Sequence, residues 1–161
     1  MILEVNKMEK TNELNKFLSY IHMGQSIYRI YYEEAKKFEC KTLEDLIVKI
    51  MEKFKGHEEK ISSLIEDEGE CATDSLTMAG VMGVYKERMK LFSTVESIIT
   101  SAIKSTNMGL ISGIKFIHDN NELPKTVKEA INKVLLDYNK IESMLIDLAI
   151  YETNKLIVIK K

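Results

Sequence analysis

The chain has 161 residues, of which 23 are basic and 25 are acidic, and its formal net charge is −2. This balance provides no basic surface of the kind that binds nucleic acid, and no apolar run approaches the ~18 residues of a membrane span. One proline, seven glycines and no tryptophan, with many helix-forming residues, indicate a single all-α domain over residues 1–161. The charged stretch 1–15 lacks the apolar core of a signal peptide, which favours a cytoplasmic protein.

The first two long helices follow from apolar residues spaced at steps of three and four, the period of one helix face. The first helix is predicted over residues 12–37, and its stripe contains Leu14, Phe17, Leu18, Ile21, Gln25, Tyr28, Tyr32 and Ala35. Thr42 is predicted to cap the second helix, with Asp45 three residues later as a variant of the capping box. The second stripe covers residues 43–64 and ends in the acidic, glycine-containing stretch 66–70.

A shorter helix is predicted over residues 76–92, after a start signal at Asp74-Ser75, and it would carry the chain across the bundle. The sequence 93–96, Ser-Thr-Val-Glu, is a capping box that begins the third long helix, whose stripe runs over residues 95–117.

Pro124, the only proline, fits the first position of the last long helix, whose stripe runs over residues 127–148. The apolar tail 156–159 either extends this helix or pairs at a partner surface. We therefore expect an antiparallel four-helix bundle with a core over about residues 12–152 and an extra short helix between the second and third long helices.

Each apolar stripe carries a polar residue near its midpoint, and a bundle would bring these residues to one level of its core. They are Gln25, His57, the Thr106-Asn107 pair and Tyr138. Bundles hold metals or cofactors at such levels, but a polar layer also fixes helix register without binding anything.

A di-iron centre in a bundle needs about four inward carboxylates and two Glu-x-x-His motifs. The residues three positions before the three histidines are not acidic: they are Ser19, Phe54 and Lys115. The sequence therefore predicts no di-iron centre and no enzymatic activity. His57 and Glu142 remain as candidate metal ligands, and two such ligands would hold at most one weakly bound transition metal, with water completing its shell.

Short motifs in a fixed order, over roughly residues 14–148, carry a family resemblance. These motifs are Leu14-Asn15, Gly24-Gln25, Glu34-Ala35, the glycine-ended second helix, Ser75-Leu76, Ala79-Gly80, Lys90-Leu91 and Leu123-Pro124 with Val127. The chain resembles the ferritin-like bacterial proteins of unknown function that are related to the YciF stress protein. The resemblance implies a ferritin-like bundle, often a homodimer. In that family the position of Gln25 is commonly acidic, and so is a position within residues 105–109. The position of Glu142 is commonly His.

Two functional hypotheses follow from these residues. The first is a non-catalytic bundle without a cofactor that acts by self-association or by binding a protein partner, in stress or sporulation physiology. The alternative is a metal-binding or redox protein of the ferritin-like kind with an atypical site around His57 and Glu142.

Overall fold

The computed structural model describes residues 1–159, and for residues 2–11 it describes the backbone alone. Within this part of the chain the regular structure is helical, with no strand: the helices are α1 (Ile2–Lys37), α2 (Lys41–Asp67), α3 (Met78–Arg88), α4 (Val95–Asp119) and α5 (Lys125–Ile159). The prediction of an all-α chain is confirmed. The last two residues of the predicted domain, 160 and 161, lie outside the described residues.

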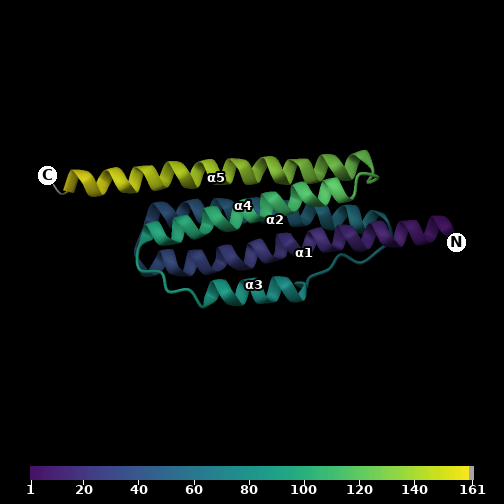
Figure 1. Ribbon diagram of the computed structural model, residues 1–161, viewed down its shortest axis with the longest axis horizontal. Coiled ribbons are helices and arrows are strands. Elements are labelled where there is room, and N and C mark those ends of the chain that lie inside the picture. The colour runs from purple at the N-terminus through teal and green to yellow at the C-terminus, as the bar shows by residue number, and fades with distance from the viewer. Residues whose placement is uncertain (160–161) are drawn as a thin grey trace.

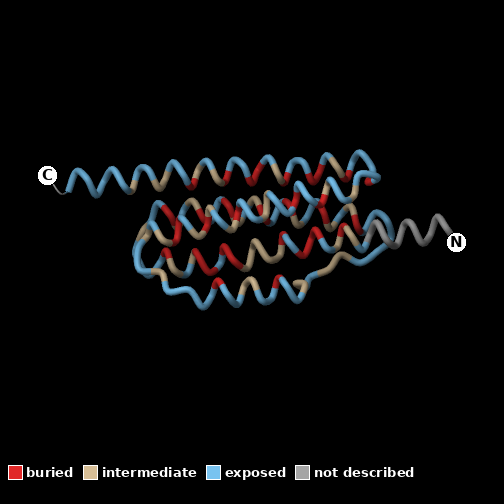
Figure 2. Tube along the Cα trace, viewed as in Figure 1, coloured by how far each residue is buried: buried red, intermediate tan, exposed pale blue. Residues whose placement is uncertain are grey.

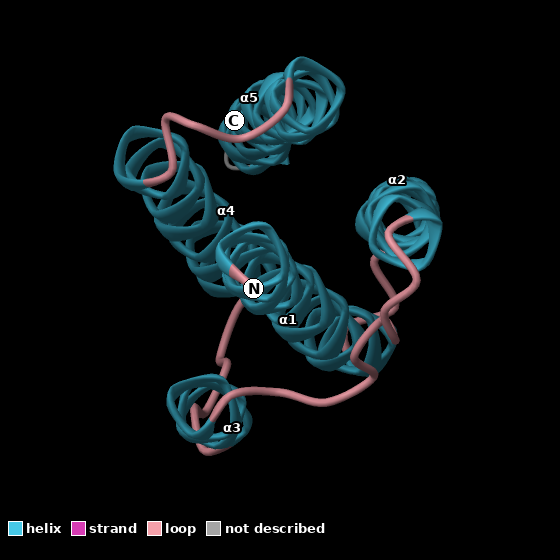
Figure 3. Ribbon diagram, turned by 90° about the vertical axis from the view of Figure 1, so that its right-hand side faces the viewer, coloured by secondary structure: helices cyan, strands magenta, loops and turns pink. Residues whose placement is uncertain are grey.

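The four long helices lie side by side, and the short helix α3 lies outside them (Figure 1). Helix α1 packs against α2 and α4, and helix α5 packs against α4 and α2. The described contacts of α3 with other helices are those with α1, and the view along the bundle places α3 at the edge, far from α5 (Figure 3).

One hydrophobic core joins the four long helices. Leu18 of α1, Ile50 of α2, Ile99 of α4 and Ile131 of α5 are all fully buried in it, as the apolar stripes predict. The buried positions recur along each of these helices, whereas the C-terminal part of α5 is exposed (Figure 2). The helices α1 and α2 approach closely at Gly24, where an added Cβ would lie 2.5 Å from Cε1 of the Phe54 ring.

The first two helices begin earlier than predicted. Helix α1 starts at Ile2 and not near Asn12, because the preceding Glu, Lys, Met and Leu residues favour helix and Asn12 is not a cap. Helix α2 starts at Lys41, so the prediction that Thr42 caps it is wrong. Glu39, at φ +53°, turns the chain tightly enough for the helix to begin before Thr42. Thr42 Oγ1 instead donates to Glu152 of α5 at 3.3 Å.

The remaining helix starts are each displaced by one or a few residues. Helix α3 is capped by Thr77, whose hydroxyl accepts from the backbone N–H of Gly80 at 3.1 Å. The capping box of α4 is formed by Thr94 and Ser97, not by Ser93 and Glu96 as predicted. Pro124 directly precedes α5, and its carbonyl accepts the first helical hydrogen bonds. The tail 156–159 continues α5 as helix, which is one of the two alternatives that the sequence left open.

Candidate functional site

The predicted polar layer is only partly present in the core. His57, Thr106 and Tyr138 are buried, whereas Gln25 is half-buried and Asn107 is exposed. Asn107 therefore does not belong to the layer, because it lies on the face of α4 next to Thr106 and away from the core. The ring of Tyr138 packs against His57, with ring centroids 6.0 Å apart. The three buried residues thus do not form one shared hydrogen-bonded group.

A buried hydrogen bond joins His57 of α2 to Asp137 of α5. The distance from His57 Nε2 to Asp137 Oδ2 is 2.9 Å, and both side chains are almost completely buried. Because an ionised carboxylate can only accept, Nε2 carries the proton and donates to it. The sequence analysis missed Asp137, although its position three residues after Val134 and four before Ile141 places it on the apolar face of α5.

The charges around this pair fix its protonation. Burial opposes the charge of Asp137, but the hydrogen bonds from His57 and Lys133 and the charges of Lys53 and Lys133 outweigh burial and lower the pKa of Asp137 to about 2. Burial, with help from the two lysines, lowers the pKa of His57 even though Asp137 acts in the opposite direction. At neutral pH the pair is therefore a carboxylate and a neutral imidazole.

A surface groove with a volume of about 610 Å³ lies between α2 and α5 beside this pair. Its lining residues are Lys53, Gly56, His57, Lys60, Thr126, Glu129, Ala130, Lys133, Val134 and Asp137. The lining contains no serine or cysteine, and its one hydroxyl residue, Thr126, makes no described hydrogen bond to His57, so the groove shows no hydroxyl or thiol activated by that histidine. The pair is best understood as a buried contact that holds α2 to α5.

Glu142, the second candidate metal ligand, is not brought to His57 by any described contact. His57 Nδ1 and Glu142 Oε1 are nevertheless the two buried side-chain atoms of the described residues that have no hydrogen-bond partner. Over the same part of the chain, no cluster of three or more His, Cys, Asp or Glu side chains is placed to hold a metal ion. A structural zinc takes four ligands and a catalytic zinc takes three protein ligands, so this pair alone is an incomplete donor set.

Gln25 joins a different polar group, on the face between α1 and α2. Its Nε2 donates to Glu58 at 2.6 Å, and its Oε1 lies 3.2 Å from His22 Nδ1. The other ring nitrogen of His22 lies 2.8 Å from the carbonyl oxygen of Thr73. Both ring nitrogens thus lie within hydrogen-bond distance of oxygen atoms, and the tautomer of the ring decides which of them donates. This group ties the loop after α2 to α1.

Tyr28 and Tyr31 of α1 are buried and join this helix to its neighbours. Tyr28 lies 2.5 Å from Thr106 Oγ1 of α4. Tyr31 donates to Glu87 of α3 at 2.5 Å and lies 2.6 Å from Ser105 Oγ of α4. Burial, together with the bond to Glu87, raises the pKa of Tyr31. Tyr31 therefore fastens α3 and α4 to α1.

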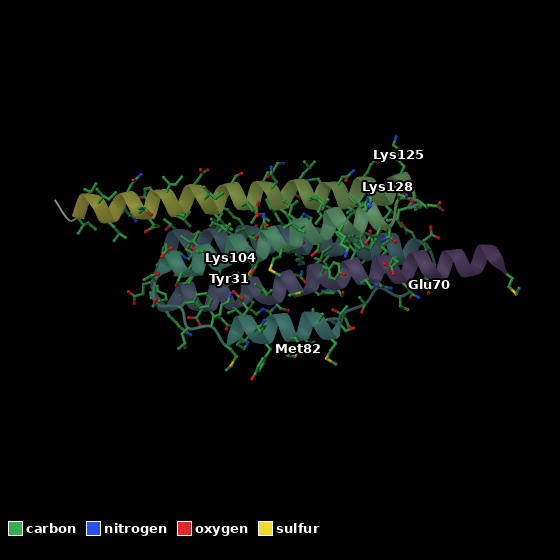
Figure 4. The ribbon with its side chains drawn as sticks, viewed as in Figure 1. Tyr31, Glu70, Met82, Lys104, Lys125 and Lys128 are labelled. Carbon is green, nitrogen blue, oxygen red and sulfur yellow. The ribbon has the colours of Figure 1, made fainter. Side chains whose placement is uncertain are left out.

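Helix α3 faces the bundle with its small and polar residues. Gly80 and Glu87 are buried, and Gly80 and Gly83 leave room for the side chain of Met23 of α1. The large apolar side chains point the other way, with exposed fractions of 48–79% for Met78, Val81, Met82, Tyr85 and Met89. Figure 4 shows Met82 on the outer side of α3 and Tyr31 in the interior. We call these five residues the α3 face.

Comparison with protein-family models finds none that matches this chain, and a search of curated proteins finds no match either. Across the described residues, no helix combines the length and the apolar character that a membrane crossing requires.

Proposed function

We propose that this chain is a non-catalytic, cytoplasmic helical protein that acts by binding other protein chains. The observation that carries the proposal is the α3 face. A helix in a protein normally turns its apolar stripe towards the core, whereas α3 turns glycines and Glu87 inward and leaves three methionines, a valine and a tyrosine in water. Exposed apolar patches of this kind mark interaction sites, and methionine suits adaptable ones.

The charges beside the α3 face indicate the chemistry of its partner. Lys86, Arg88 and Lys90 are exposed beside it. Arg88 pairs with Glu33 of α1 at 3.6 Å, and Lys90 pairs at 2.6 Å with Glu87, which is buried against Tyr31, so the border keeps a net positive charge at Lys86. An apolar stripe with a basic border is complementary to an amphipathic helix with an acidic border. We therefore infer that the partner presents such an acidic helix, and that a second copy of α3 would be repelled.

The order of packing supports a ferritin-like bundle as the scaffold. The pairs α1–α2 and α4–α5 pack most extensively, and the segment that contains α3 separates them in the chain. A single long connection between two helical hairpins is the ferritin-like topology. With the resemblance to stress-related bacterial proteins, this scaffold makes a role in stress or sporulation physiology part of the proposal.

Site-specific photo-crosslinking tests the proposed function. A photoreactive amino acid placed at Met82 in cells should give an adduct with a specific protein, whereas the same group at the exposed Val48 of α2 should not. The captured protein is then purified and its affinity is measured. Met82→Glu should weaken binding at least about tenfold, equivalent to about 1.4 kcal/mol, and Val48→Glu should leave it unchanged. Equal affinity of both variants, or binding only to anionic lipid vesicles, would refute the proposal.

A second candidate function rests on the two unpartnered atoms, His57 Nδ1 and Glu142 Oε1. They would be the ligand atoms for the single weakly bound transition metal of the alternative hypothesis from the sequence. Metal analysis of protein purified without a histidine tag tests it. A stoichiometric metal that is lost in both His57→Ala and Glu142→Ala would support this function, and a metal-free protein after incubation with excess zinc would exclude it.

A further inference from the structure

A second surface of different chemistry runs along α5. Seven of its residues follow one another at alternating steps of three and four, so they share one face of the helix. These residues, which we call the α5 seam, are Leu136, Asn139, Ser143, Ile146, Ile150, Thr153 and Ile157. All seven are exposed and none is charged. The spacing is the a/d heptad pattern by which two helices supercoil around each other.

The described residues of the chain do not cover this seam. Leu136, Ile146, Ile150 and Ile157 have exposed fractions of 60%, 46%, 56% and 54%. From residue 153 to residue 159 every position of α5 is exposed, so the last two turns lack the packed apolar face that normally stabilises a helix (Figure 2). An additional element that packs on the seam would supply that face.

The polar members of the seam are compatible with burial. Ser143 Oγ donates to the carbonyl oxygen of Asn139, and Thr153 Oγ1 donates to that of Ala149, at 3.1 and 2.9 Å. Their hydroxyl protons are thus already bonded within α5 and need no partner across an interface. Asn139 is the one amide, and a single asparagine in an a/d seam is tolerated and helps to fix register.

The absence of charge on the seam indicates what covers it. In a two-fold pair, both subunits offer the same patch, so any charge on it meets a like charge or must be offset. A neutral seam meets its own copy without such repulsion, unlike the basic α3 face. We propose that the α5 seam is a homodimer interface, in which α5 of one chain packs along α5 of a second copy.

The size of the seam sets the expected strength. It spans 21 residue steps, or about 32 Å at 1.5 Å per residue, and a strip about 10 Å wide over that length covers about 300 Å². That is well below the ~800 Å² per partner of a standard stable interface. The dimer should therefore be reversible, and dilution should dissociate it.

Sedimentation equilibrium over a concentration series tests the seam with a matched pair of variants. Ile157 and Val158 are adjacent, exposed apolar residues of the last turn, but only Ile157 belongs to the seam. The mass of the wild type should rise towards that of two chains with concentration. Ile157→Asp should weaken association at least about tenfold, whereas Val158→Asp should associate like the wild type. Asn139→Ile, which replaces the one amide by an apolar residue, should tighten the dimer.

Two results would overturn the inference: a wild type that stays monomeric at every concentration, or equal effects of Ile157→Asp and Val158→Asp. Circular dichroism should show at most a small loss of helix from the last two turns of α5 in any variant, because these side chains have no core contact and the bundle stays folded. The inference goes beyond the proposed partner binding and uses a surface separate from the α3 face. A monomer whose captured partner still depends on Met82 would end the dimer proposal alone, whereas a dimer without an α3 partner would end the proposed partner alone.

Discussion

Replacing Asp137 by Asn removes the one buried carboxylate that joins α2 to α5, and the structure gives the size of the effect. The pKa of Asp137 falls from the ordinary 3.8 to about 2 in the folded chain. Since each pKa unit corresponds to about 1.4 kcal/mol, the ionised side chain stabilises the fold by about 2 kcal/mol. We expect Asp137→Asn to lower the free energy of unfolding at neutral pH by about that amount.

His57 makes the largest single contribution to this stabilisation. The lysines around Asp137, namely Lys53, Lys133 and Lys140, have side chains 37–65% exposed, and exposed ion pairs contribute only about 0.2–1 kcal/mol each. The His57 ring is 7% exposed and its hydrogen bond goes to a charged acceptor, a class that contributes about 1.5–3 kcal/mol.

The pH dependence of stability shows whether Asp137→Asn acts by removing a charge or by changing the packing of the side chain. The folded-state pKa of Asp137 lies below its unfolded value, so its contribution is complete above pH 3.8 and is lost as the pH falls to about 2. The pKa of His57 is also lowered, from 6.5, so its contribution is present above that value and declines on acidification as well. The wild type should lose stability in both steps, and Asp137→Asn should lack the one between 3.8 and 2.

Urea unfolding followed by far-ultraviolet circular dichroism, at a series of pH values, measures these differences. Asp147→Asn is the matched control, because Asp147 is an exposed acid on the same helix, and it should change stability by less than about 0.5 kcal/mol. The reasoning would be refuted if Asp137→Asn equalled the wild type at neutral pH. It would also be refuted if the difference stayed the same at pH 2.

Three further substitutions test the packing and the turns, each by the same unfolding measurement. Ile131 is fully buried, so Ile131→Ala should cost about 2–5 kcal/mol, and a loss below about 1 would contradict the shared core. Gly24→Ala would place a Cβ 2.5 Å from the Phe54 ring. The overpacking cost of about 1–3 kcal/mol should exceed the ~1 kcal/mol that alanine gains in helix propensity. A net increase in stability would argue against the close approach. Glu39 has φ +53°, a conformation that costs a non-glycine residue about 1–2 kcal/mol, so Glu39→Gly should raise stability and a decrease would speak against a strained turn.

The sequence predicts the helices well because their apolar stripes have a clear period. The stripes correctly placed Leu18, Ile50, Ile99 and Ile131 in one core. The helix starts were less predictable, since several residues near each start can act as caps. The choice between Ser93 and Thr94 depends on backbone angles that no local pattern specifies, and Thr94 adopts the extended conformation that a cap requires.

The candidate site was only partly predictable, because the partner of a buried polar residue lies on another helix. His57 was found from its place on the apolar face of α2, but its partner Asp137 is 80 positions away. Gln25 shows the same limit, since its distance from the core axis depends on how α1 is rotated, and Glu58 draws it to the α1–α2 face. The outward orientation of α3 follows from Tyr31, which bonds Glu87 and so turns the apolar residues of α3 away.

The two proposed surfaces should respond to salt in opposite ways. Binding of an acidic helix to the α3 face uses the net positive charge beside it, chiefly that of Lys86, and salt screens such exposed charge, with a Debye length of about 10 Å at 0.1 M and about 3 Å at 1 M. The α5 seam carries no charge, so its association relies on apolar burial, which salt does not weaken. Raising sodium chloride from about 0.1 M to about 1 M should lower the affinity for the α3 partner and leave the affinity of the two copies for each other unchanged or slightly higher. A dimer that dissociated with added salt would show that charged residues outside the seam hold the two copies together.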